Sequence, residues 1–175
     1  NVLVYTLQAI SKPALRRGII APSGLPIEVQ THHTRVDGVR IVPRSGYYVV
    51  EVVYEQAETQ TAVDPSLYAG IDIGLNNLAA ITSNKEGFVP RIVNGRPLKS
   101  INQYYNKEHA KLQSCLPNKQ YSSRHVERLT TKRTRRINHY LHCASRRIID
   151  LLVAEGIGTL VIGKNDCWKQ EINIG

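Results

Sequence analysis

Short segments of alternating apolar and polar residues dominate the first third of the chain. Ile27 and Val29 alternate with polar neighbours, Val39 and Ile41 repeat the pattern, and residues 47–54 extend it. Alternation with a period of two predicts strands that turn one face toward a core. Turn-forming residues separate these strands at Asp37-Gly38 and Arg44-Ser45-Gly46. The pattern predicts a small β-barrel-like or sandwich-like segment over residues 1–63.

Three more strands are predicted between residues 68 and 93. Their apolar runs lie at 71–73, 78–81 and 89–93, and short stretches of turn-forming residues separate them. Connections this short predict an antiparallel meander. The polar stretch before them has the composition of a linker, so we predict a second domain over residues 64–175.

Helical periodicity follows the strands. A first helix is predicted to begin near Ser100, where Gln103 completes a capping box, and to end at Pro117. A longer helix follows and stops at Gly156, and its apolar positions recur at spacings of three and four: Ile137, Leu141, Ala144, Ile148, Leu151 and Leu152. Residues 159–162 then form a short strand, which we expect to lie parallel to an earlier one. The predicted fold class is α/β (α+β), with a mixed sheet and helices.

Composition narrows the range of functions. The 175 residues carry a net charge of +9 and a pI near 9.6, which favours a polyanionic partner such as nucleic acid. No apolar run is long enough to span a membrane, and the start of the chain lacks a signal peptide, so we predict a cytoplasmic, nucleoid-associated protein. The cysteines Cys115, Cys143 and Cys167 are widely spaced, which predicts reduced thiols and no zinc site made by these residues alone.

Asp72, at the centre of the motif GIDIG, is the candidate catalytic and metal-binding residue. Its neighbours Ile71 and Ile73 belong to one face of the predicted strand, so its side chain belongs to the other. A carboxylate held inside a domain needs an arginine, backbone donors or a metal ion. Mg²⁺ is commonly held by one or two carboxylates. The alternative is a turn aspartate that accepts hydrogen bonds from amides near Gly74.

Residues 124–147 concentrate positive charge on the longer predicted helix. Only Glu127 interrupts the sign, and like charges three or four residues apart repel each other unless a polyanion relieves the repulsion. A solvated outer face is the alternative, but such a face usually mixes signs. We predict that the following cations bind a nucleic-acid backbone: Arg124, Arg128, Lys132, Arg133, Arg135, Arg136, Arg146 and Arg147.

Two histidines, His139 and His142, stand three residues apart on the same helix. They could ligate a metal ion, but no third ligand stands at a suitable spacing. We interpret them as polar surface residues or as further hydrogen-bond donors to phosphate.

Several segments, taken in order, resemble the TnpB/OrfB family of insertion-sequence proteins. The first RuvC-like motif of that family is similar to GIDIGLNNLAAITS, and its upstream β-barrel strands are similar to IVPRSGYYVVEVVYEQ. Its following helices are similar to NGRPLKSINQYYNKEHAKLQS and RLTTKRTRRINHYLHCASRRIIDLL, and its next strand and loop to GTLVIGKNDCWKQEINIG. The resemblance covers most of residues 27–175.

The resemblance implies an RNase H-like (RuvC-like) nuclease domain whose first catalytic acid is Asp72. Members of the family are encoded by transposable elements, are similar to type V CRISPR effectors, and cleave DNA under the direction of a noncoding guide RNA. The implied partners are therefore DNA and a guide RNA. The implied cofactors are two Mg²⁺ or Mn²⁺ ions that support phosphodiester hydrolysis.

The end of the chain departs from the family pattern. Many members have a glutamate after the strand that matches Leu160–Ile162, whereas this chain has Gly163-Lys164, and some branches carry this glutamate on a later strand. Asp166 and Glu171 stand nearby without matching the motif. We expect the chain to be a fragment whose remaining acids, together with the family's cysteine zinc ribbon, would lie beyond Gly175.

Two other functions stay open at this point. A catalytically incomplete protein of a mobile element would bind nucleic acid without cutting it. A GIDIG motif followed by a hairpin also resembles the phosphate loop of sugar kinases and Hsp70-type ATPases. Those enzymes usually need a second glycine-rich phosphate motif, and the sequence has none.

Overall fold

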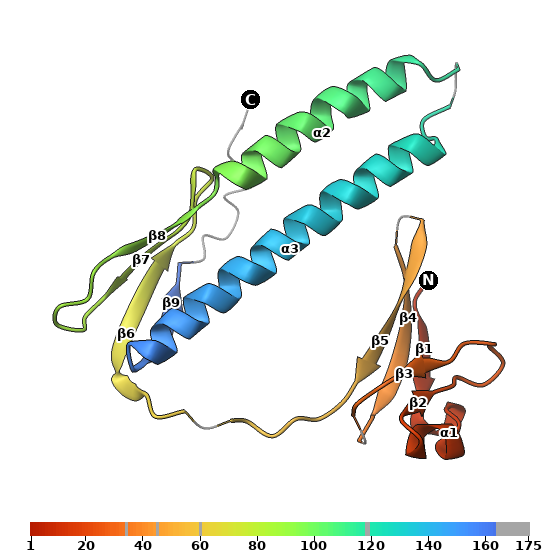
Figure 1. The fold of residues 1–175 in the computed structure, drawn as a ribbon, viewed down its shortest axis with the longest axis horizontal. Helices are drawn as coiled ribbons and strands as arrows, with labels where there is room; N and C mark the ends of the chain where they lie inside the picture. The colour runs from red at the N-terminus through yellow and green to blue at the C-terminus, as the bar shows by residue number, and fades with distance from the viewer. Residues whose placement is uncertain (34, 45, 60, 118–119, 164–175) are drawn as a thin grey trace. The chain divides into compact units, whose positions relative to one another are not determined.

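The computed structural model describes residues 1–33, 35–44, 46–59, 61–117 and 120–163 (Figure 1). The chain divides into two compact units, Asn1–Thr59 and Gln60–Gly175. Among the described helices, none combines the length and the apolar content needed to cross a membrane.

The first unit consists of short strands around a small apolar core. Its elements are β1 (Leu3–Thr6), η1 (Leu7–Ala9), α1 (Lys12–Arg16), β2 (Ile19–Ile20), β3 (Val29–Gln30), β4 (Gly38–Arg44) and β5 (Tyr47–Val53). An antiparallel sheet has the strand order β1–β4–β5, and β2 and β3 form a separate pair. Ile20 and Val39 are completely buried, and Ile10 and Val36 pack with them.

The sheet of the first unit is open, which corrects the barrel-like part of the sequence prediction. The predicted alternation is confirmed in β4, where Val39 and Ile41 are buried and Arg40 between them is exposed. Gly46, with a φ of +79°, provides the tight turn into β5. A closed barrel requires the last strand to pair with the first. Among the described residues, however, β1 and β5 each pair only with β4.

The second unit is built on a four-stranded mixed sheet (Figure 1). Its strands are β6 (Asp64–Asp72), β7 (Asn77–Ser83), β8 (Arg91–Asn94) and β9 (Ile157–Ile162), in the order β8–β7–β6–β9. The first three form an antiparallel meander, and β9 returns parallel to β6. Both the meander and the parallel return strand confirm the sequence predictions.

The helix α2 (Arg96–Ser114) begins earlier than predicted. Ser100 lies inside the helix, so the capping box proposed there is wrong. Pro97 stands in the first turn, where its fixed φ favours a helix start. The Asn94 side chain accepts a hydrogen bond from the Arg96 amide (3.0 Å), which satisfies one of the free donors at this end.

The helix α3 (Arg124–Ala154) lies beside α2 and covers one face of the sheet (Figure 1). It begins after the Ser123 cap and ends before Gly156, whose φ of +71° stops it as predicted. Ala144 and Leu152 of the predicted apolar stripe are buried, whereas Leu141 is 41% exposed. The core that joins helix and sheet consists of Ala69, Ile71, Ala79, Ile81, Leu152 and Ile157.

A Leu152→Ala substitution tests how firmly α3 is held on the sheet. Because Leu152 is 4% exposed and belongs to the core, its truncation is expected to lower the free energy of unfolding by about 2–5 kcal/mol. Leu141→Ala removes the same atoms from an exposed position of the same helix and is expected to cost less than about 1 kcal/mol. Urea unfolding of both variants measures the difference. An equal loss of unfolding free energy in the two variants would show that α3 does not pack on the sheet through this stripe.

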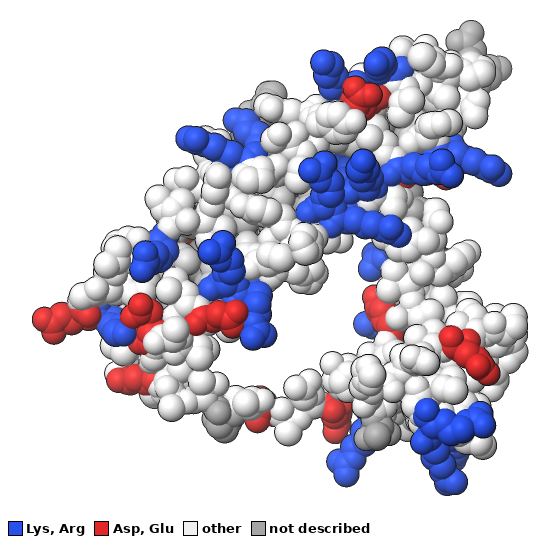
Figure 2. Space-filling view, viewed as in Figure 1, with Lys and Arg blue, Asp and Glu red and all other residues white. Residues whose placement is uncertain are grey.

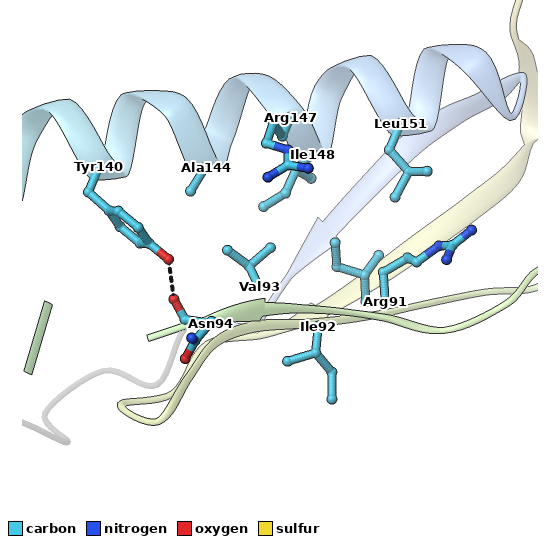
Figure 3. A pocket seen from close by; sticks show the side chains of 10 residues that line it. Arg91, Ile92, Val93, Asn94, Tyr140, Ala144, Arg147, Ile148 and Leu151 are labelled. Atoms are coloured by element: carbon cyan, nitrogen blue, oxygen red, sulfur yellow. Dashed lines mark hydrogen bonds between the residues drawn. The ribbon is translucent and has the colours of Figure 1, made fainter. Parts of the chain in front are cut away.

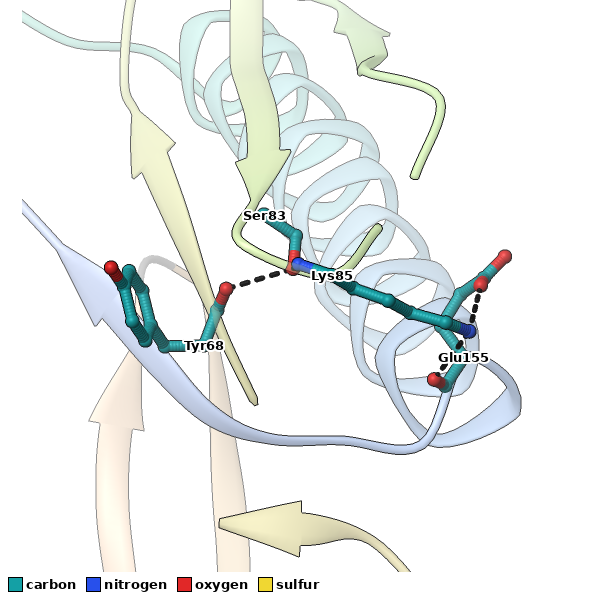
Figure 4. Close-up of polar contacts among 4 residues, drawn as sticks. All are labelled: Tyr68, Ser83, Lys85 and Glu155. Carbon is teal, nitrogen blue, oxygen red and sulfur yellow. Dashed lines mark hydrogen bonds and ion pairs between the residues drawn. The ribbon is translucent and has the colours of Figure 1, made fainter. Parts of the chain in front are cut away.

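An ion pair fastens the end of α3 to the turn after β7 (Figure 4). Lys85 Nζ lies 2.7 Å from the Glu155 carboxylate and donates a second hydrogen bond to the Glu155 backbone oxygen (2.8 Å). Beside this turn, the Ser83 hydroxyl donates a hydrogen bond to the Tyr68 carbonyl oxygen (2.8 Å). The hydrogen bond from Lys85, together with its charge, lowers the pKa of Glu155.

Acid is expected to weaken this contact. Because the pKa of Glu155 is lowered in the folded protein, the stabilisation is present above the ordinary value of 4.5 and is lost as the pH falls through the lowered pKa. Lys85→Met, which cannot form the ion pair, should have a lower Tm than the unchanged protein at pH 7, and this gap should narrow at pH 3. Thermal unfolding at both pH values measures the gap. A gap that is independent of pH would contradict the ion-pair assignment.

Candidate functional site

Asp72 is the last residue of β6, an interior strand of the sheet. On one side it pairs with Ala80 of β7. On the other side, the Gly163 amide donates a hydrogen bond to the Ile71 carbonyl oxygen (3.4 Å). The carboxylate therefore stands where β6 and the parallel strand β9 end together. Ligands commonly bind at this end of parallel strands.

The Asp72 side chain is exposed. The sequence argument expected this carboxylate to be held inside the domain, and that expectation is wrong. Ile71 is buried in the core under α3, so alternation places Asp72 on the opposite face of the sheet, which the described residues leave open at this point. The Asp72 side chain forms no hydrogen bond or ion pair with any other described residue. The turn-aspartate alternative is not found either, because the Gly74 amide donates to the Leu78 carbonyl oxygen (3.4 Å). The carboxylate is therefore available to a ligand.

A glycine, Gly163, occupies the position beside Asp72 at the end of β9. A Cβ atom added at Gly163 would meet only the Ile71 carbonyl oxygen, at 4.0 Å, so packing does not require glycine here. Asp166 and Glu171 lie outside the described residues. Within the described ranges, no three or more His, Cys, Asp or Glu side chains gather as a metal site.

Most of the predicted cations of α3 lie exposed on the helix surface. Figure 2 shows Lys and Arg gathered along this helix, with few acids among them. All eight predicted cations except Arg133 are exposed. We call the following residues, which pair with no described residue, the α3 cationic face: Arg124, Arg128, Lys132, Arg136 and Arg147. Their charges are available to a polyanion.

Three of the predicted phosphate-binding residues, Arg133, Arg135 and Arg146, interact with other residues of the protein and are therefore not counted in this face. Arg133 is half-buried, donates from Nε to the Asn102 side chain (2.8 Å) and lies 5.0 Å from the centre of the Tyr105 ring. Both partners belong to α2, so Arg133 holds the two helices together. Arg146 forms an ion pair with Asp150, one turn further along α3 (2.9 Å).

Asp72 and the α3 cationic face lie on different sides of the sheet. α3 packs its apolar stripe on the sheet face that holds Ile71, and Arg147 of its cationic face stands between α3 and β8 on that side. Asp72 belongs to the opposite face. The structure therefore does not gather the candidate acid and these cations in one pocket. A polymer, rather than a small molecule, is the kind of ligand that can contact both.

Comparison with known sequences decides the family. A family model described as a probable transposase, OrfB_IS605, matches residues 51–168. This chain belongs to that transposase family. The match includes Asp72 and the whole of α3, and it confirms the resemblance inferred from the sequence. No curated protein matches the chain in sequence.

Two solved structures are similar to this OrfB-family chain. The cryo-EM structure of the Cas12f1–sgRNA–target DNA complex matches with a TM-score of 0.60 and 16% identity, over 78% of this chain and 29% of that chain. A CRISPR–Cas12f ternary complex matches with a TM-score of 0.48 and 15% identity, over 78% and 28% respectively. The first match confirms the predicted RNase H-like (RuvC-like) fold class. This chain spans less than a third of either matched chain.

In this OrfB-family chain, a groove of about 470 Å³ lies between α3 and β8 (Figure 3). Apolar side chains of both elements line it, and Arg147 and Arg91 stand on its two walls. The Tyr140 hydroxyl donates a hydrogen bond to the Asn94 carbonyl oxygen across it. Sequence reasoning missed Arg91, because no spacing along the chain connects it with Arg147.

The thiol of Cys143 lies beside His139 on α3, which sequence reasoning also missed. Cys143 Sγ is 3.7 Å from His139 Nε2 and 4.0 Å from Nδ1, and both residues are exposed. Their spacing of four residues, one helical turn, was the available signal. His142 joins no group of three potential ligands within the described residues. Cys115 and Cys143 are free thiols as predicted, and Cys167 lies outside the described residues.

Proposed function

We propose that this chain contributes the first catalytic acid, Asp72, of a transposon-encoded, RNA-guided DNA endonuclease of the TnpB type. One observation carries the proposal: an exposed carboxylate, without a side-chain partner among the described residues, ends an interior strand of an RNase H-like sheet, beside the end of a parallel strand. Membership of the probable transposase family supports the same function.

The chemistry of Asp72 suits a divalent metal ion. Carboxylate oxygens are the ligands that Mg²⁺ and Mn²⁺ prefer, and a residue on an interior strand offers them from a rigid position. When bound, two such ions would activate the attacking water and stabilise the leaving oxygen of the phosphodiester. We propose that Asp72 holds these ions and that the other acids of the site come from outside the described residues.

The α3 cationic face would hold a nucleic-acid backbone without reading its sequence, because arginine and lysine contacts to phosphate position a strand but do not specify bases. The similar Cas12f1 structure is a complex with sgRNA and target DNA, which supports a guide RNA and DNA as partners. Pairing between guide and target would then select the sequence.

A second candidate is a protein that binds nucleic acid without cutting it. The glycine at position 163, beside Asp72, favours it, since many family members have a glutamate at the matching position.

A cleavage assay on the full-length protein, loaded with the noncoding RNA of its own element, separates the two candidates. The endonuclease should cut matched DNA in Mg²⁺, should stop in EDTA, and should resume when Mn²⁺ is added. RNA binding measured in the same samples is the control. Retained RNA binding without cleavage in any metal would refute the endonuclease and support the second candidate.

A further inference from the structure

We propose that a pocket in the first unit binds the phosphate group of a nucleotide. The pocket has a volume of about 460 Å³ and lies between α1 and the loop that follows β3. Four side chains that line it can donate hydrogen bonds to an anion: Lys12, Arg16, Thr31 and His33. None of the described residues that line it is an acid. The pocket shares no residue with the proposed nuclease site, so the proposal does not rest on that function.

The two cations of the pocket belong to one side of α1. Lys12 and Arg16 stand four residues apart, about one helical turn, and both are exposed. Neither side chain forms a hydrogen bond or ion pair with another described residue. Figure 2 shows Lys and Arg gathered over α1. Like charges at this spacing repel each other, and an anion bound between them would remove the repulsion.

Backbone contacts hold the opposite wall of the pocket in place. The Thr31 amide donates a hydrogen bond to the Gly18 carbonyl oxygen (2.8 Å), directly beside the pairing of β2 with β3. Gly18 has a φ of +74°, and a Cβ atom added there would lie 3.0 Å from the Thr31 carbonyl oxygen. Both the backbone angle and the close approach favour glycine. The pocket is therefore built by fixed backbone on this side.

The two polar side chains of this wall keep donors for a ligand. Thr31 Oγ1 accepts a hydrogen bond from the His33 amide (3.1 Å), so the hydroxyl proton of Thr31 remains available. The His33 ring stacks on the Tyr54 ring, with centroids 3.4 Å apart and planes inclined by 17°. This stacking holds the imidazole, which has an N–H donor in either tautomer, at the pocket.

These donors and the volume indicate the class of ligand. A phosphate monoester has three acceptor oxygens and up to two negative charges, which match two cations and two further donors. A guanidinium such as that of Arg16 binds phosphate through two parallel hydrogen bonds. The volume lies within the range of about 300–1,000 Å³ that is typical of small-molecule sites, so there is room for more than a phosphate. Leu15 and the His33 ring offer apolar surface to a nucleoside.

AMP is the probe for this site, and adenosine, which lacks the phosphate, is its control. NMR of the full chain follows the histidine ring signals, and His33→Gln identifies the His33 signal by its loss. AMP should shift this signal with saturation, whereas adenosine at the same concentrations should not. Arg16→Gln should weaken the binding of AMP roughly 10-fold or more, because it removes charge-assisted hydrogen bonds to the phosphate.

The next residue, Arg17, provides the matched control. Arg17 is exposed but does not line the pocket, so Arg17→Gln removes the same charge and should leave the affinity for AMP close to that of the unchanged protein. Circular dichroism checks that both variants keep their secondary structure. The proposal would be overturned if AMP does not shift the His33 signal, if adenosine shifts it equally, or if both arginine variants lose affinity equally.

A short RNA with a 5′-phosphate, compared with the same RNA carrying a 5′-hydroxyl, identifies the source of the phosphate. If the phosphorylated RNA binds more tightly than AMP, and Arg16→Gln removes this gain while Arg17→Gln does not, the ligand is a nucleic-acid end. If AMP binds as tightly as the phosphorylated RNA, the ligand is a free nucleotide.

Discussion

Asp72→Asn is expected to lower the rate of guided DNA cleavage by the full-length protein roughly 1,000-fold or more. Asparagine keeps the size of the side chain but loses the negative charge that holds divalent ions, and a loss of several kcal/mol of transition-state stabilisation corresponds to this factor. The Asp72 side chain is exposed and bonds to no described residue, so the substitution should leave folding and RNA affinity unchanged. Cleavage of labelled DNA, RNA binding and thermal unfolding measure the three properties.

The other end of the same strand offers a matched control. Asp64 begins β6 and accepts hydrogen bonds from the amide and hydroxyl of Ser66 (2.8 and 2.6 Å), which lower its pKa. Asp64→Asn makes the same chemical change away from the proposed site and should leave the cleavage rate close to that of the unchanged protein. Undiminished cleavage by Asp72→Asn, or an equal loss in both variants, would contradict the catalytic assignment.

Local sequence patterns predicted most of the second unit because each pattern involves residues that are close along the chain. The meander follows from three apolar runs with short turns, and α3 follows from its apolar stripe and Gly156. The start of α2 was missed because Pro97 and Asn94, rather than the more obvious Ser100, define it. Of the barrel-like and sandwich-like arrangements predicted for the first unit, a closed barrel is not found among the described residues, because closure depends on pairing between distant strands, which alternation does not encode.

For the candidate site, too, local sequence predicted some features, whereas others depend on tertiary packing. The position of Asp72 on an interior strand could be inferred from GIDIG, but its exposure depends on which elements cover each face of the sheet. Likewise, charge along the sequence identified the cationic helix but not the role of each residue. Arg133 is directed to α2 by Asn102 and Tyr105, which stand about 30 residues earlier. Only tertiary packing separates such a residue from the free cations around it.

Replacing Arg128, Lys132, Arg136 and Arg147 with glutamine is expected to weaken binding of duplex DNA and to flatten its salt dependence. Each lost phosphate contact should lower the slope of log affinity against log salt by about 0.9, so four contacts lower it by about 3–4. Between 50 and 200 mM salt, the unchanged chain should therefore lose about 100-fold more affinity than the variant. Fluorescence anisotropy at several salt concentrations measures both slopes.

Substitution of two arginines in the first unit shows whether DNA binds to the α3 cationic face or responds only to the net charge of the protein. Arg40 and Arg44 lie 2.9 and 3.8 Å from the Glu51 carboxylate, so their charges are already partly balanced. Arg40→Gln with Arg44→Gln should change the slope by much less for each charge removed than the α3 variant does. If both variants lose affinity equally per charge, the net charge of +9 alone would account for binding. A loss confined to α3 would instead require the phosphates to lie along that helix, because counterion release counts only the charges in contact with the backbone.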